Sequence, residues 1–61
     1  ADFNAKKLDS VTIFKNQCAI LIDFLEDKRK DFSDPETNRL ISIAQTEIEN
    51  ASMWGVKALT S

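Results

Sequence analysis

The chain has 61 residues, one cysteine, no histidine and a formal net charge of −2. A chain below about 70 to 80 residues gains little stability from one core, and this one lacks the residues for a disulfide or a structural zinc site. Its acidic balance disfavours an extended DNA-binding surface, and no apolar run approaches the ~20 residues of a membrane span or marks a secretion signal. We expect one small soluble domain in the cytoplasm, stabilised by oligomerisation, that binds neither DNA nor membrane.

Helical spacing of the apolar residues predicts an all-α fold. Residues 1–8 are expected to form a short helical turn or an arm capped by Asn4, and Asp9 or Ser10 is the expected cap of a first long helix over about 10–30. The basic residues at 28–30 suit the negative C-terminal end of that helix. One face carries an apolar stripe with steps mostly of three and four: Val11, Phe14, Cys18, Leu21, Ile22 and Leu25.

A second long helix is predicted over about 35–59. Asp34 is a good N-cap, and Pro35 fits the first helical turn because its missing N–H would have no partner there. The predicted architecture is a single helical domain, a hairpin of two long antiparallel helices. The face expected to pack on the first helix carries Leu40, Ala44, Ile48, Ala51, Ala58 and Leu59.

Both helices carry more apolar residues than one partner helix can cover. The first helix has a second line at Ile13, Ile20 and Phe24. At about 25 cal/mol per Å² of apolar surface, leaving such side chains in water forfeits several kcal/mol, so we predict a closed, symmetric homo-oligomer. The surplus residues of the second helix are Ile41, Ile43, Met53, Trp54 and Val56.

Ala51 and Gly55, four residues apart, are expected to let another helix approach closely, with Trp54 filling the space beside them. A glycine inside a helix costs about 1 kcal/mol relative to alanine, so Gly55 is expected to have a packing reason. A base-stacking role for Trp54 is the alternative.

No catalytic arrangement is evident, because nucleophile–histidine pairs and most metal sites need the histidine that this chain lacks. Cys18 lies on the apolar stripe and is expected in the core. The carboxylates of Asp23, Glu26 and Asp27 are expected to form surface pairs with nearby cations. We therefore expect no metal, no cofactor and no enzymatic activity.

Residues suited to anion binding occur at two places. Near the N-terminus, Phe3 with Lys6 and Lys7 combines an aromatic face for a base with ammonium groups for phosphate; a packed Phe beside solvated lysines is the alternative. Arg39 lies near the start of the second helix, where exposed N–H groups add positive potential. A surface ion pair with the carboxylate at position 34 or 36 is the alternative for Arg39.

The second helix also resembles a known family. The segment NRLISIAQTEIENASMWGVKAL is similar to the C-terminal signature of the bacteriophage anti-CBASS sponge family, small proteins that sequester the cyclic oligonucleotide messengers of bacterial CBASS immunity. The first half is more loosely similar: FNAK, at residues 3–6, stands where those proteins carry an aromatic residue and a turn, and Phe14 takes a second aromatic position. The matching positions of the second helix are Arg39, Ser42, Ala44, Thr46, Glu49, Ala51, Met53 and Trp54.

The resemblance implies a helical subunit assembled into a hexamer, with cyclic dinucleotides such as cGAMP held between subunits. It implies a nucleotide-binding pocket at Phe3, Asn4, Lys6 and Lys7, where the aromatic ring stacks on a base and a basic side chain pairs with phosphate. Arg39 then lines a separate pocket for cyclic trinucleotides.

The chain departs from the family on the first long helix. The family's basic residue there falls near Cys18 or Ala19, and neither side chain can pair with phosphate. Either Lys15 or an N-terminal lysine replaces it, or the alignment of this half is displaced, or dinucleotide binding is altered.

The leading hypothesis is a phage immune-evasion protein that sequesters cyclic di- or trinucleotides in the host cell without cleaving them. The alternative is an oligomeric helical protein-interaction module with no nucleotide ligand. A DNA-binding regulator is disfavoured because the second helix offers only Arg39 and Lys57 as cations.

Overall fold

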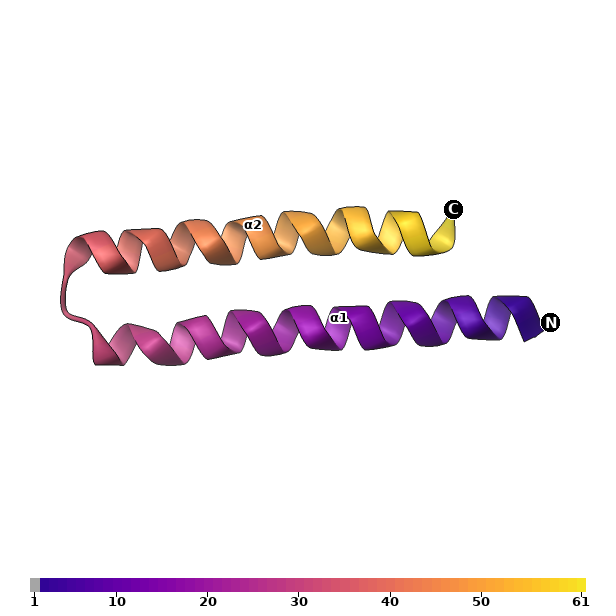
Figure 1. Ribbon diagram of the computed structural model, residues 1–61, viewed down its shortest axis with the longest axis horizontal. Helices are drawn as coiled ribbons and strands as arrows, with labels where there is room; N and C mark the ends of the chain where they lie inside the picture. The colour runs from indigo at the N-terminus through magenta and orange to yellow at the C-terminus, as the bar shows by residue number, and fades with distance from the viewer. Residues whose placement is uncertain (1) are drawn as a thin grey trace.

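The structure is a computed structural model that describes the backbone of residues 2–61 and the side chains of residues 9–61. Helix α1 spans Asp2–Lys28, a short 3-10 turn η1 spans Arg29–Asp31, and helix α2 spans Pro35–Thr60. The two long helices run antiparallel, side by side, so the two termini lie at one end and the connection at the other (Figure 1). The Cα atoms extend over 50 × 16 × 6 Å, which is a single layer of two helices. The predicted all-α hairpin is confirmed.

The start of the first helix differs from the sequence-based expectation. Helix α1 begins at Asp2 rather than near residue 10, so the backbone of residues 2–8 belongs to the helix and is not a separate turn or arm. The segment contains neither glycine nor proline, and Ala, Lys and Leu at positions 5–8 are good helix formers. Asp9 and Ser10 are therefore tolerated inside the helix instead of capping a new one.

Helix α2 begins as predicted, with Asp34 as its N-cap and Pro35 in its first turn. The Asp34 carboxylate accepts hydrogen bonds from the backbone N–H and the hydroxyl of Thr37, both at 2.9 Å. The Asn38 side-chain amide donates to the backbone oxygens of Phe32 and Asp34, at 3.1 and 3.2 Å. These bonds satisfy polar groups at the helix start and hold the connection against it.

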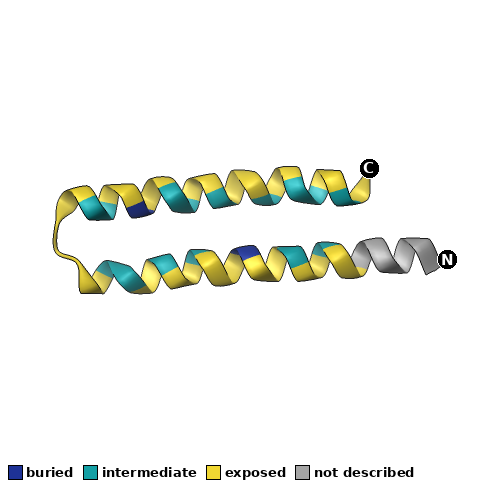
Figure 2. Cartoon of the chain, viewed as in Figure 1, coloured by how far each residue is buried: buried dark blue, intermediate teal, exposed yellow. Residues whose placement is uncertain are grey.

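Two side chains are the most deeply buried of the seam between the helices. Cys18 and Ile41 are 7% and 8% exposed and are the buried hydrophobic residues of the described chain (Figure 2). The predicted core position of Cys18 is confirmed. The other side chains along the seam are half-buried: Val11, Phe14, Ile22 and Leu25 of α1, and Ala44, Ile48, Ser52, Gly55, Val56 and Leu59 of α2.

The face of α2 that meets α1 was predicted only in part, with Ala44, Ile48 and Leu59 in the seam as expected. Ile41, predicted to be surplus, is buried, whereas Leu40 is 52% exposed and Ala51 and Ala58 are exposed. Leu40 and Ile41 are adjacent apolar residues, so spacing alone did not decide between them. On α1 the predicted stripe is largely correct, with Leu21 as its exposed member.

Gly55 has a packing role within the hairpin. A Cβ atom added at this position would overlap Cε2 and Cζ of Phe14, so the glycine leaves room for that ring. The predicted packing reason is present, but the neighbour is an aromatic side chain of the same chain. Trp54, next to Gly55, is 66% exposed and does not fill the seam.

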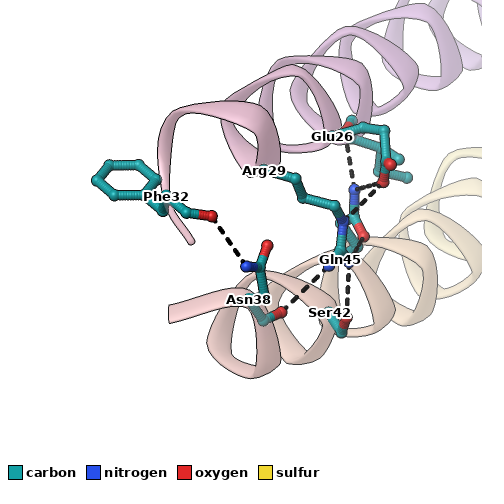
Figure 3. Close-up of polar contacts among 7 residues, drawn as sticks. Glu26, Arg29, Phe32, Asn38, Ser42 and Gln45 are labelled. Atoms are coloured by element: carbon teal, nitrogen blue, oxygen red, sulfur yellow. Dashed lines mark hydrogen bonds and ion pairs between the residues drawn. The ribbon is translucent and has the colours of Figure 1, made fainter. Parts of the chain in front are cut away.

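Arg29 joins the two helices at the connection end of the hairpin (Figure 3). Its Nε donates to Glu26 Oε1 at 3.0 Å, and its Nη1 donates to the Asn38 backbone oxygen at 3.3 Å. Its Nη2 donates to Ser42 Oγ at 2.6 Å and to Gln45 Oε1 at 2.9 Å. The planar guanidinium supplies donors in several directions at once, which is why one side chain can link α1 to three residues of α2.

Gln45 completes this network from the other helix. Its Nε2 donates to the Ile22 backbone oxygen and to Glu26 Oε1, both at 3.1 Å. The Arg29–Gln45 network therefore fixes the register of the two helices where the apolar seam alone permits sliding.

We expect Gly55→Ala to lower the free energy of unfolding by about 1 to 3 kcal/mol, because the Phe14 ring must move to admit the new methyl group. In a Phe14→Ala background the same change should raise it by up to about 1 kcal/mol, because alanine is the better helix former. Urea denaturation followed by circular dichroism at one protein concentration measures both values. An equal effect in the two backgrounds would contradict the contact.

We expect the capping contribution of Asp34 to depend on pH. The pKa of its carboxyl lies below the ordinary 3.8, chiefly because the carboxylate accepts the Thr37 backbone N–H. Its stabilisation is therefore complete above pH ~3.8 and is lost as pH falls through the folded-state pKa. The melting temperature of Asp34→Ala should lie below wild type at pH 7, and the gap should narrow below pH 4. Asp34→Asn, which caps without titrating, is the control; a constant gap would refute the linkage.

Candidate functional site

Arg39 lies in the second turn of α2 and points away from α1. It forms an ion pair with Glu36, in which Nε donates to Oε1 at 3.0 Å and to Oε2 at 3.3 Å, and Nη2 contacts Oε1. Both side chains are more than half exposed, and an exposed ion pair of this kind contributes little stability. The ion pair considered in the sequence analysis is present, yet an anionic ligand can compete with Glu36 for the guanidinium.

A hollow of about 260 Å³ lies on the outer surface of α2, one turn beyond Arg39. It is lined by Ser42, Ile43, Thr46 and Glu47. Positions 39, 42, 43, 46 and 47 are spaced by three and four, so they share one face of the helix. The lining combines two hydroxyl groups, an apolar side chain and a carboxylate next to an exposed arginine, which suits a ligand with phosphate, sugar and base groups.

The Ser42 hydroxyl is oriented by Arg29. Its oxygen accepts the Arg29 Nη2 hydrogen bond at 2.6 Å, and its own proton remains available to donate. A hydroxyl held in this state favours an acceptor such as a phosphate oxygen. The structural network at the connection thus also orients one group of the hollow.

The remaining described cations divide into engaged and available groups. Lys28 forms an ion pair with Asp31 at 3.7 Å, and Lys30 forms one with Asp27 at 2.7 Å. Arg29 is engaged in the hydrogen-bond network with Gln45. Lys57 lies over the Trp54 ring, 5.4 Å from its centroid. Among residues 9–61, Lys15 alone of the cations has neither an ion pair nor an aromatic contact, which leaves it open to phosphate.

The carboxylates near Arg29 do not form a catalytic pair. The pKa of Glu26 is lowered by hydrogen bonds from Gln45 and Arg29, so this group stays ionised and cannot serve as a general acid near neutral pH. Residues 9–61 contain no cluster of histidine, cysteine or acidic side chains that could hold a metal ion. Over the same residues, no helix is long and apolar enough to cross a membrane.

The N-terminal candidates, Phe3, Asn4, Lys6 and Lys7, lie outside the described side chains. Their backbone belongs to the first turns of α1, at the end of the hairpin opposite the connection (Figure 1). Arg39 lies near the connection, and the hairpin is 50 Å long. One copy of the chain therefore cannot place Arg39 and the N-terminal segment around the same small ligand.

The hollow itself was not predicted from the sequence. Ser42 and Thr46 were named only through the resemblance, Ile43 was taken as a surplus apolar residue, and Glu47 was given no part in nucleotide binding. The helical spacing could have grouped these residues, because steps of three and four from Arg39 lead through all four positions. What the spacing could not show is that these side chains leave a hollow between them.

Comparison with known proteins agrees with the helical hairpin fold. The family model described as "Acb2/Tad1, hairpin domain" matches residues 2–60. No curated protein and no solved structure matches the chain. Sponges of the Acb2 type bind their ligands rather than cleave them, which agrees with the expected lack of enzymatic activity. The chain therefore belongs to the Acb2/Tad1 hairpin-domain family, in which Acb2 is a phage anti-CBASS cyclic nucleotide sponge.

Proposed function

We propose that this protein sequesters the cyclic di- or trinucleotide messengers of bacterial CBASS defence in the cytoplasm of the infected host, without cleaving them. The family match over residues 2–60 carries the proposal. A sponge works by stoichiometric binding, so it needs affinity and a closed pocket and no catalytic group. The single layer of helices with a hollow on one outer face is compatible with that task.

Arg39 and the hollow beside it are the proposed trinucleotide site. The guanidinium pairs with a phosphate after displacing Glu36, and the Ser42 hydroxyl donates to a second phosphate oxygen. Ile43 offers apolar contact to a base, and the Thr46 hydroxyl and the Glu47 carboxylate accept hydrogen bonds from sugar or base groups. The hollow of about 260 Å³ is open, so a second subunit is needed to enclose the ligand.

A dinucleotide site is proposed at the other end of the hairpin. There Phe3 stacks on a base, Asn4 hydrogen-bonds to it, and Lys6 or Lys7 pairs with phosphate. Lys15, the described lysine without another partner, is a further candidate for phosphate because it lies on the same helix two to three turns on. This assignment rests on the family resemblance and on residue chemistry.

The two proposed sites lie at opposite ends of one chain, so an oligomer is part of the proposal. We propose a homo-oligomer, with a hexamer as the expected form, in which neighbouring subunits enclose each pocket. The exposed apolar surface of both helices supports association.

The decisive experiment mixes the pure protein with cGAMP or a cyclic trinucleotide and measures free ligand before and after heating. A sponge removes the ligand from solution at a fixed molar ratio and releases it intact when the protein unfolds. Cleaved product identifies a nuclease and refutes the proposal. Absence of binding to every cyclic di- and trinucleotide favours the alternative, a helical protein-interaction module.

The two sites should respond separately to mutation. We expect Arg39→Ala to weaken trinucleotide binding by at least tenfold and to change dinucleotide binding much less, because a charged hydrogen-bonded contact is worth more than about 1.4 kcal/mol. Phe3→Ala should do the reverse through loss of base stacking. Isothermal titration calorimetry with both ligands measures these ratios.

Two further variants control for charge. Lys30→Ala removes one exposed, paired cation, as Arg39→Ala does, and should leave both affinities unchanged. Glu36→Gln frees the Arg39 guanidinium and should strengthen trinucleotide binding severalfold. Equal losses for both ligands in Arg39→Ala, with an unchanged thermal melt, would indicate one shared pocket and contradict the two-site arrangement.

A further inference from the structure

Glu47 is the charged side chain among the four that line the hollow on the outer surface of α2. It is exposed, and among residues 9–61 it has no hydrogen-bond partner and no ion pair. The positions three and four residues away on either side hold uncharged residues: Ile43, Ala44, Asn50 and Ala51. No cation of α2 therefore lies where a helical ion pair with Glu47 would need it, and its carboxylate is available to a ligand.

The lining of the hollow changes in character along the axis of α2. At 1.5 Å per residue, Ser42 lies about 4.5 Å beyond Arg39, and Glu47 lies about 12 Å beyond it. The guanidinium and the Ser42 hydroxyl therefore lie at one end and the carboxylate at the other, with Ile43, 44% exposed, between them. A nucleotide has the same order of groups, because its phosphate, the flat faces of its base and the polar outer edge of that base follow one another.

This order determines which part of a bound nucleotide meets Glu47. Phosphate and carboxylate are both negative, and placing like charges together disfavours binding, so the phosphate binds at the Arg39 end. A carboxylate accepts hydrogen bonds and donates none, so it needs an N–H or O–H group of the ligand. With the face of the base against Ile43, the donors that reach Glu47 are those on the Watson–Crick edge of the base.

Guanine is the base whose Watson–Crick edge matches a carboxylate. Its N1–H and N2–H groups are adjacent and parallel, so the two oxygens of one carboxylate accept both of them. Adenine presents its N6–H beside the N1 lone pair, and cytosine presents its N4–H beside the N3 lone pair. Uracil has one N–H between two carbonyl oxygens. In each of these three bases a lone pair faces the second carboxylate oxygen, which then has no donor.

We propose that Glu47 is a specificity-determining residue that selects guanine. The hollow then takes a cyclic trinucleotide that contains a guanine in preference to one built from adenine alone. This inference rests on the proposed function and names the base that the site beside Arg39 reads. The carboxylate accepts the N1–H and N2–H groups of guanine, Ile43 contacts the face of the base, and Arg39 pairs with phosphate.

The test compares two ligands by isothermal titration calorimetry. One is cyclic tri-adenylate, and the other is the cyclic trinucleotide in which guanine replaces one adenine. Wild type should bind the guanine-containing ligand about tenfold more tightly, because a bidentate contact distinguishes bases by at least that order. With inosine in place of guanine the affinity should fall between the two, because inosine keeps N1–H and lacks the N2 amino group.

Glu47→Gln supplies the reciprocal measurement. Glutamine keeps the size and the helix propensity of glutamate, so the fold should be unchanged. Its amide replaces one acceptor with a donor, and this pair of groups matches the N6–H and N1 of adenine. The ratio of the two affinities should therefore move toward cyclic tri-adenylate by about tenfold. A thermal melt of the variant checks that the hairpin is intact.

Glu49→Gln is the matched control. It makes the same change of charge two positions on, at an exposed residue that does not line the hollow. Two residues turn the helix by about 200°, so Glu49 lies on nearly the opposite side of α2, and its variant should keep the wild-type ratio.

Two failures would look different. Equal affinities of wild type for the two ligands, or a ratio that Glu47→Gln leaves unchanged, would overturn the selection of guanine and leave the sponge in place. An equal loss for both ligands in Glu47→Gln belongs to the second case and would put a sugar hydroxyl against the carboxylate. Binding of neither ligand by wild type would overturn the trinucleotide site of the proposed function, and the inference with it.

Discussion

Two helices in a single layer can bury only one stripe each, and this limit governs the rest of the structure. The seam buries Cys18 and Ile41 and half-buries a line of neighbours. Every other large apolar side chain must find cover outside the hairpin or stay in water. The exposed Trp54, Phe24 and Ile20 are therefore a direct consequence of the architecture.

Polar contacts fix the register of the two helices, which the narrow apolar seam alone does not. An apolar stripe of regular spacing permits two helices to slide past one another by a turn, whereas directed hydrogen bonds hold at one register. Arg29 provides these bonds at the connection end, and the Phe14–Gly55 contact limits sliding toward the other end. The two arginines near the connection thus have different functions. Arg29 is engaged in hydrogen bonds that hold the two helices together, whereas Arg39 pairs only with the exposed Glu36 carboxylate, which a ligand can displace.

Much of the fold was predictable because helix signals are local. Asp34 and Pro35 marked the start of α2 correctly, and the surplus at Ile13, Ile20 and Phe24 is exposed as expected. The predicted start of α1 was wrong, because the capping residues Asp9 and Ser10 lie between good helix formers and the helix continues through them. The hollow beside Arg39 was missed because spacing shows which residues share a face, whereas a hollow depends on the volumes and rotamers of those side chains.

Residue type and spacing along the chain are enough to establish the helical class, the position of the connection, the excess of apolar surface and the family. Tertiary structure alone decided between Leu40 and Ile41 for the seam, and it alone decided that Arg29 is structural while Arg39 stays exposed. Those outcomes depend on the rotation and register of one helix against the other. That relation arises from contacts between residues distant in sequence, such as Phe14 with Gly55 and Ile22 with Gln45.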